Sequence, residues 1–217
     1  MKQRSAHWLR PPGPVAPGMK IGLLGGSFNP AHEGHLHVTE TALKRLGLDY
    51  VWWLVAPQNP LKPAAGMAPL CERIAVAADR FEQHPRIAIV DVETAFGTRY
   101  TIDTLTALKR RFPQVHFVWL MGTDNLQGFR RWKRWADIAL SVPIAVVMRP
   151  GSTLATLHAK AAQRFVCSRR DRSALRHLAT ASPPCLVVLD GRRSGASSTA
   201  IRARTARDEA LLRIIPA

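Results

Sequence analysis

Two histidines, His32 and His35, lie three residues apart at the end of a glycine-rich stretch, residues 25–35 (GGSFNPAHEGH). A short apolar run precedes this stretch, and apolar residues at helical spacing follow it up to Gly47, so it joins a strand to a helix. A helix start offers unpaired N–H groups and a partial positive charge, and imidazoles there add hydrogen-bond donors. These residue types predict binding of phosphate oxygens. The alternatives are two ordinary histidines at a helix start, or a zinc pair with His37 that lacks a third well-placed ligand.

A second candidate phosphate site lies near the carboxyl end of the chain. Ser198, Thr199 and Arg202 place two hydroxyls and a guanidinium at the start of a predicted helix, residues 200–207. Donors of this kind at a helix start suit a phosphate group. The alternative is a plain helix cap with a surface arginine.

Strands alternate with helices along most of the chain. We expect strands at residues 21–24, 50–56, 86–92, 115–121, 143–148 and 186–190. We expect helices at residues 36–46, 69–81, 100–112, 125–129, 131–139, 152–162 and 200–207, with a short loop at 94–99.

Most of these strands are continuous apolar runs, which is typical of a mostly parallel sheet covered by helices on both faces. The sequence therefore predicts a Rossmann-like, doubly wound α/β fold. In such sheets ligands bind at the carboxyl ends of the strands. The loops expected along that rim are residues 25–35, 57–62, 94–101, 122–132, 149–151 and 190–199.

The composition is that of a globular protein with a strongly positive charge. The chain has 217 residues, and its 31 Lys and Arg against 15 Asp and Glu give a formal net charge of +16. This charge attracts nucleic acid, nucleotides and phosphorylated metabolites, although a solvated basic surface is the simpler interpretation. Three cysteines without a CxxC pair predict neither a zinc ribbon nor a disulfide framework, and indicate a reducing, cytoplasmic setting.

Residues 1–18 differ from the rest of the chain. They are basic, rich in Pro and Gly, and lack the apolar core of a secretory signal. We interpret them as a mobile N-terminal extension or as a misassigned start, with Met19 as an alternative first residue. Residues 19–217 are then expected to form a single domain. No apolar run reaches the length of a transmembrane helix.

Five stretches, in sequence order, resemble motifs of one enzyme family. GGSFNPAHEGHL is similar to the (H/T)xGH signature of the nucleotidyltransferase superfamily, in the form seen in bacterial nicotinate-nucleotide adenylyltransferases. The other four are residues 57–62 (PQNPLK), residues 98–105 (TRYTIDTL), Gly122-Thr123-Asp124 with Trp132 eight positions beyond the Asp, and residues 197–202 (SSTAIR). The resemblance runs from about Lys20 to Arg207, with Asn29 where many relatives have Asp.

The resemblance implies adenylyl transfer from ATP to nicotinate mononucleotide, giving deamido-NAD and pyrophosphate in NAD biosynthesis. The attacking phosphate is already an anion at neutral pH, so the reaction needs positioning and charge stabilisation rather than a general base. Mg²⁺ is expected to enter with ATP and to keep water and substrate oxygens as ligands, so no protein metal ligand is assigned.

The resemblance also assigns roles to individual residues. It implies catalytic contacts by His32, His35 and Arg202, and ATP contacts by these residues and by Gly25, Gly26, Ser27, Phe28, Gly122, Asp124, Ser198 and Thr199. For the acceptor it implies Lys62, Tyr100 and Thr101, with Trp132 stacked on the pyridine ring. The alternatives are a turn-capping Asp124, a solvated Lys62, and Trp135 in place of Trp132.

Two other functions are compatible with the sequence. One is another nucleotidyltransferase of the same superfamily, such as a phosphopantetheine adenylyltransferase, against which the Tyr-Thr segment and Trp132 argue. The other is a non-catalytic module that binds nucleotides or RNA, prompted by the +16 charge. No nucleic-acid or membrane partner is expected for the enzyme.

Overall fold

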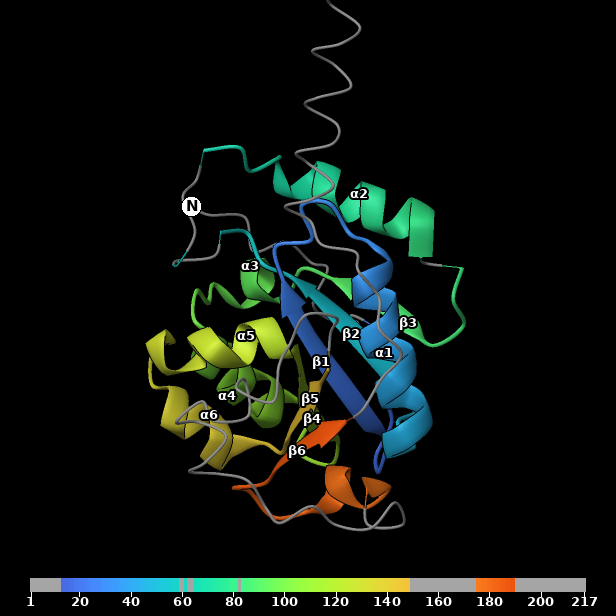
Figure 1. Ribbon diagram of the computed structural model, residues 1–217, viewed down its shortest axis with the longest axis vertical. Helices are drawn as coiled ribbons and strands as arrows, with labels where there is room; N and C mark the ends of the chain where they lie inside the picture. The colour runs from blue at the N-terminus through green and yellow to red at the C-terminus, as the bar shows by residue number, and fades with distance from the viewer. Residues whose placement is uncertain (1–12, 59–60, 62–64, 82, 149–174, 190–217) are drawn as a thin grey trace, which may run out of the picture.

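A six-stranded parallel sheet forms the centre of the protein (Figure 1). The computed structural model describes residues 13–58, 61, 65–81, 83–148 and 175–189. The strands are β1 (Lys20–Gly26), β2 (Tyr50–Val55), β3 (Ile87–Val90), β4 (His116–Gly122), β5 (Ile144–Val147) and β6 (Leu186–Leu189). They lie in the order β3-β2-β1-β4-β5-β6, and all five pairings are parallel. The predicted doubly wound α/β fold is confirmed.

Helices connect the strands. They are α1 (Glu33–Leu46), α2 (Leu70–Phe81), α3 (Val92–Phe96), α4 (Thr101–Arg111), α5 (Thr123–Gly128) and α6 (Trp135–Ser141), with 3-10 helices η2 (Phe129–Arg131) and η4 (Leu178–Thr180). Because side chains alternate across a strand, each strand contributes to two hydrophobic cores, one on either face of the sheet.

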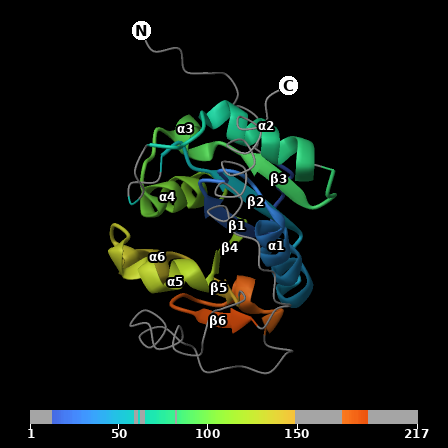
Figure 2. The same ribbon diagram turned by 45° about the horizontal axis from the view of Figure 1, so that its top comes forward.

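The two cores are covered by different helices. Val38 and Leu43 of α1, Ala77 and Phe81 of α2, and Leu178 of η4 belong to one core. The other core is formed with buried residues of α3 to α6 and of η2, namely Val92, Ile102, Leu105, Leu108, Leu126, Phe129, Ile138 and Ala139. Figure 2 shows α1 and α2 on one side of the sheet, with α4, α5 and α6 on the other.

The ends of α1 follow its sequence. Gly47 terminates the helix in a left-handed conformation, φ 61°, as the predicted stop. Lys44 and Arg45 in the last turn interact favourably with the negative end of the helix dipole. The helix begins at Glu33, three residues earlier than the apolar spacing predicts, because His32 caps it there.

Two expected elements are wrong in detail. The loop predicted at residues 94–99 is partly helical, since α3 occupies Val92–Phe96 and ends at Gly97 with φ 64°. The helix predicted at residues 131–139 is divided, because Trp132 is extended and Arg134 has a left-handed φ of 51° before α6 begins. The helices predicted at 152–162 and 200–207 lie outside the described residues.

The described part of the N-terminal segment, from residue 13, packs on the core, so the expected mobility is wrong for these residues. Val15 and Met19 lie against the core on the α3–α6 side. The N–H of Gly18 donates to the carbonyl of Gln114 at 2.8 Å. Among the helices of the described residues, none has the length and apolar character needed to cross a membrane.

Candidate functional site

The carboxyl ends of β1 and β4 lie side by side in the middle of the sheet. β1 pairs with β2 on one side and with β4 on the other, so the strand order reverses at this point. Ligands of open parallel sheets bind at such a switch point. β1 ends in Gly25 and Gly26, and β4 ends in Gly122. The structure therefore brings the glycine-rich turn and the Gly122–Asp124 element to the same part of the rim.

His32 and His35 together cap the first turn of α1. His32 is the N-cap residue and is 2% exposed, and its Nδ1 accepts a hydrogen bond from the N–H of Gly34 at 3.0 Å. The N–H of His32 donates to Nδ1 of His35 at 3.2 Å. This is a capping box in which imidazoles replace the usual hydroxyl and carboxylate.

The capping bonds define the tautomer of each ring. A neutral imidazole that accepts at Nδ1 carries its proton on Nε2, so each ring has its donor on the side away from the cap. The two ring centroids are 3.9 Å apart. His35 also lies 4.6 Å from Phe28 and 5.9 Å from Trp53, centroid to centroid. Packing on aromatic rings restricts the orientation of the His35 imidazole.

The turn itself is tightly built. Phe28 is 1% exposed, stacks on Trp53 at 5.1 Å, and has a left-handed φ of 45°, which is strained for a residue with a side chain. A Cβ on Gly25 would lie 2.5 Å from Cη2 of Trp119, so only glycine fits there. The Asn29 side chain donates to the carbonyl of Gly66 at 2.8 Å, which links the turn to the segment before α2.

The element after β4 continues directly into α5. Gly122 is the N-cap residue, with φ −80° and ψ 162°, and Thr123 is buried. Asp124 lies in the first turn of α5 and is exposed. The rim at β4 therefore presents a carboxylate next to the glycine-rich turn of β1.

Tyr100 and Thr101 form the start of α4. Tyr100 is the N-cap residue, its carbonyl accepts from the N–H groups of Asp103 and Thr104, and its side chain does not cap the helix. The Nζ of Lys133 lies 4.1 Å from the centre of the Tyr100 ring, a cation–π contact. This contact joins the start of α4 to the segment that carries Trp132.

Trp132 lies in the break between η2 and α6 and belongs to an aromatic cluster. Its ring stands edge-on to Trp119 at 6.0 Å and to Phe129 at 5.4 Å. Trp135 is the first residue of α6 and contacts Phe129 at 6.0 Å. The two tryptophans are therefore on different elements, and Trp132 shares its neighbour Trp119 with Gly25.

Sequence reasoning missed two charged residues at this rim. Arg73 of α2 is 2% exposed and bonds to the turn, and its only sequence signal is helical spacing with the buried Ala77 and Phe81. Glu93 of α3 follows β3, and its burial raises the pKa of its carboxyl to about 7. The predicted residues Lys62, Ser198, Thr199 and Arg202 lie outside the residues described.

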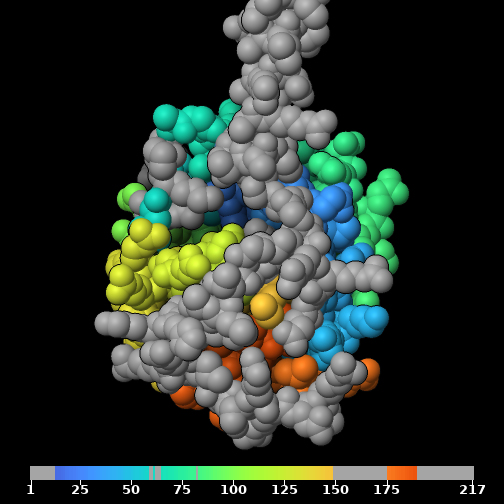
Figure 3. All heavy atoms as spheres, viewed as in Figure 1, coloured from blue at the N-terminus to red at the C-terminus, as the bar shows by residue number. Residues whose placement is uncertain are grey.

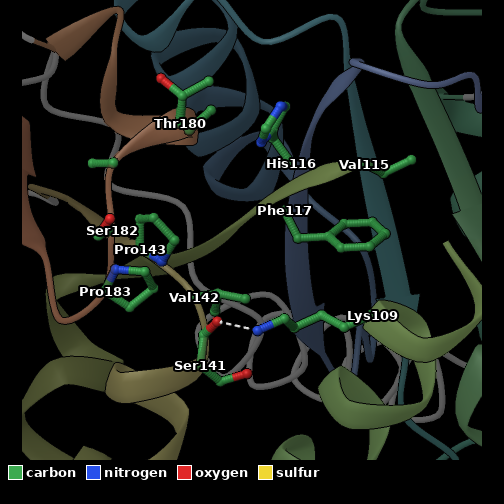
Figure 4. A pocket seen from close by; sticks show the side chains of 12 residues that line it. Lys109, Val115, His116, Phe117, Ser141, Val142, Pro143, Thr180, Ser182 and Pro183 are labelled. Carbon is green, nitrogen blue, oxygen red and sulfur yellow. Dashed lines mark hydrogen bonds between the residues drawn. The ribbon is translucent and has the colours of Figure 1, made fainter. Parts of the chain in front are cut away.

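A cavity of about 250 Å³ lies at the other end of the strands, away from the candidate site. His116 at the start of β4 and Pro143 just before β5 line it, with Thr180 and Ser182 (Figure 4). Lys109 crosses one side, where its Nζ donates to the carbonyl of Ser141 at 2.8 Å. The cavity is at the amino ends of the strands and contains none of the predicted site residues.

The space-filling view shows helices from both layers of the fold on one face of the molecule. Residues of α5 and α6, in yellow-green and yellow, lie at the left, and residues of α1, in light blue, lie at the right (Figure 3). These helices pack on opposite faces of the sheet, so elements of both layers flank the carboxyl ends of the central strands.

The comparisons with known proteins agree with this geometry. A family described as cytidylyltransferase-like matches residues 23–204. A probable nicotinate-nucleotide adenylyltransferase of Parvibaculum lavamentivorans is 56% identical over 192 residues, which cover 88% of this chain and 94% of the relative. One of Methylorubrum extorquens is 53% identical over 186 residues, which cover 86% of this chain and 100% of the relative.

A solved structure shows the same fold at low sequence identity. It is Plasmodium falciparum nicotinic acid mononucleotide adenylyltransferase complexed with NaAD, with a TM-score of 0.62 at 18% identity over 85% of this chain and 83% of the other. The fold, the histidine pair at the switch point and the identity to the curated relatives lead to one conclusion. This chain belongs to the nicotinate-nucleotide adenylyltransferase family of nucleotidyltransferases.

Proposed function

We propose that this protein transfers AMP from Mg–ATP to nicotinate mononucleotide, giving deamido-NAD and pyrophosphate, a step of NAD biosynthesis. The observation that carries the proposal is the histidine capping box at the switch point of the sheet. The chain that holds it is 56% identical to a probable nicotinate-nucleotide adenylyltransferase. This arrangement offers donors to phosphate groups, which is what adenylyl transfer requires.

The reaction is a displacement at phosphorus. A phosphate oxygen of the mononucleotide forms a bond to the α-phosphorus of ATP, the bond to the bridging oxygen breaks, and pyrophosphate leaves with that electron pair. The Nε2–H groups of His32 and His35 donate to the phosphates on which this charge develops. The first N–H groups of α1 add to the positive potential there.

The remaining ATP contacts come from both sides of the switch point. Backbone N–H groups of the turn at Gly25, Gly26, Ser27 and Phe28 face the phosphates, and Gly122 and Asp124 lie beside the ribose and adenine. In the proposed site, Ser198, Thr199 and Arg202 bind the triphosphate from a second helix start. Mg²⁺ arrives as part of the substrate, held by phosphate oxygens and water.

The acceptor occupies the side of the rim formed by α4 and the segment before α6. Trp132 stacks on the pyridine ring, and the start of α4 at Tyr100 and Thr101 faces the nicotinate carboxylate. Lys62 is assigned to the acceptor phosphate. The contact between Lys133 and Tyr100 puts a positive charge beside the start of α4, which supports the assignment of the nicotinate carboxylate to that side.

The test is pyrophosphate release with three acceptors in parallel: nicotinate mononucleotide, nicotinamide mononucleotide and phosphopantetheine. We expect turnover with nicotinate mononucleotide to exceed the other two. Preference for nicotinamide mononucleotide would overturn the acceptor assignment but not the reaction class, and preference for phosphopantetheine would assign the chain to another branch of the superfamily. Tight RNA binding at physiological salt with no pyrophosphate release would contradict the enzyme itself.

The same proposal assigns the protein to a reducing, cytoplasmic compartment. Cys71 is exposed on α2 as a free thiol, which such a compartment preserves. Fractionation of cells that express the tagged chain tests this assignment, and recovery with an oxidising compartment contradicts it.

A further inference from the structure

Arg73 is a buried arginine behind the glycine-rich turn. It lies on α2, in helical register with Ala77 and Phe81, and these three are the buried residues of that helix. Its side chain is 2% exposed, whereas Arg80 on the same helix has a half-exposed side chain in a surface ion pair with Glu33. An arginine is almost never buried so fully without specific partners.

The partners of Arg73 are backbone carbonyls from three separate segments. Its Nη1 donates to Ser27 in the glycine-rich turn at 2.5 Å and to Ala56 after β2 at 2.8 Å. Its Nη2 donates to Pro57 at 2.8 Å, and its Nε donates to Ala68 before α2 at 2.9 Å. One guanidinium therefore joins the ends of β1 and β2 to the start of α2.

No carboxylate pairs with this charge among the residues described. Burial lowers the pKa of the guanidinium from its ordinary value, and the four carbonyl dipoles compensate for lost water. A buried cation without a counter-ion leaves a positive potential at the turn. That potential favours a polyanion bound on the other side of the same turn.

The bond to Ser27 also sets the direction of the next peptide group. In a trans peptide the carbonyl and the following N–H point in opposite directions. Because the Ser27 carbonyl points to Arg73, the N–H of Phe28 points away from it. Phe28 holds the strained φ of 45°, so this peptide needs an external anchor to keep its orientation.

We propose that Arg73 is a positioning residue for the nucleotide: it fixes the Phe28 N–H toward the phosphates and couples the turn to Ala56 and Pro57 at the end of β2. This inference rests on the proposed function, since it assigns a role within that site. Arg73 touches no substrate, so its loss acts through the turn. We expect weaker binding of the ATP phosphates and slower turnover, with the fold preserved.

The test compares Arg73→Lys, Arg73→Met and Arg73→Ala with Arg80→Met as the matched control on the same helix. Lysine keeps the charge but not the fork of donors, and methionine keeps the volume alone. We expect kcat/KM for ATP to fall about 10- to 100-fold in the lysine variant and further in the methionine variant. Arg80→Met should keep the wild-type value.

Two further readouts distinguish positioning from simple destabilisation. Guanidinium ion at low millimolar concentration should restore part of the turnover of Arg73→Ala, and sodium chloride at equal ionic strength should not. Calorimetry with a non-hydrolysable ATP analogue should show weakened binding in each Arg73 variant. Circular dichroism and thermal unfolding should show that the assayed samples are folded.

Unchanged kcat/KM and unchanged analogue binding in folded Arg73→Met and Arg73→Lys overturn the inference. So does a loss of activity that follows only the folded fraction and is not restored by guanidinium. Analogue binding needs no acceptor, so it tests Arg73 even if wild-type protein fails to use nicotinate mononucleotide. Failure of the proposed function would appear instead in the wild-type acceptor assay.

Discussion

At the scale of single residues, the two histidines of the turn each use their two ring nitrogens for different purposes. Nδ1 of His32 and of His35 accepts a backbone hydrogen bond within the capping box. Nε2 remains the donor of each ring in the neutral state. A substitution therefore removes a structural acceptor and a chemical donor together, and the two effects need separate variants.

We predict that His35→Ala lowers kcat by about 100-fold, because it removes one donor to the charge that develops on the phosphates. Loss of half of the capping box should cost about 1 kcal/mol of stability. His35→Gln, which retains a capping acceptor, should recover the stability but not the turnover. Steady-state kinetics and urea unfolding measure both.

His116→Ala is the control, since His116 is exposed at the amino end of β4, away from the candidate site. It should keep wild-type turnover. Equal activity of His35→Ala and His116→Ala would remove His35 from the chemistry.

The burial of Glu93 leads us to predict that the stability of the protein depends on pH. In the folded protein burial raises its pKa to about 7, whereas the unfolded chain releases the proton near the ordinary value of 4.5. Its contribution to stability is fully present below pH 4.5 and is lost as the pH rises through about 7. Glu93→Gln cannot ionise, so we expect it to match the wild type at pH 4.5 and to be more stable at pH 8 by roughly 1–3 kcal/mol.

Urea unfolding at the two pH values measures this difference. Glu40→Gln, at an exposed position of α1, is the matched control and should show no pH-dependent gain. A gain of Glu93→Gln that is the same at both pH values would show that ionisation is not its cause.

At the scale of elements, apolar continuity was the dependable signal. Runs such as residues 50–56 and 115–121 predicted strands that the structure places at Tyr50–Val55 and His116–Gly122. Helix α3 has only five residues, little more than one turn, so its apolar pattern does not repeat and periodicity could not identify it. The break at Trp132 depends on the left-handed Arg134, a conformation that the sequence pattern does not favour.

A side chain at position 25 would make β1 clash with β4. A Cβ at this position of β1 would lie 2.5 Å from the ring of Trp119 on the neighbouring β4. Gly25→Ala should therefore cost about 1–3 kcal/mol of stability, since neither the strand nor the ring can move freely. Adding Trp119→Phe makes room, so the double variant should lose less than the sum of the single losses.

Urea unfolding of the four proteins in this cycle gives the coupling energy. Strict additivity would mean that Gly25 and Trp119 do not limit each other.

At the scale of the whole molecule, the charge of +16 bears on the two proposed substrates, which are both anions. Attraction raises the encounter rate, and added salt screens it. We predict that kcat/KM falls several-fold between about 50 and 300 mM sodium chloride, while kcat changes less. Assays in sucrose of equal osmolality are the control, and a salt-independent kcat/KM would show that the charge does not steer substrate.

Contacts between distant segments of the molecule limit how much of the site could be predicted from the sequence. The motif around His32 and His35 and its place after the first strand could be identified because their residues are contiguous. The contacts of Arg73 could not, because its four acceptors come from segments up to 46 positions away and are backbone carbonyls, which every residue has. Only the packing of α2 on the sheet defines them.

The division of the fold into two layers has a consequence for the order of release. In the proposed site, the histidine donors to the phosphates come from α1 on one layer, and the acceptor side comes from α4 to α6 on the other. A dinucleotide joins both halves covalently, so it is a bivalent ligand whose second half rebinds at a high effective concentration. Pyrophosphate contacts only the phosphate side of the site. We therefore expect it to dissociate first, and dissociation of the dinucleotide to limit the rate of each cycle.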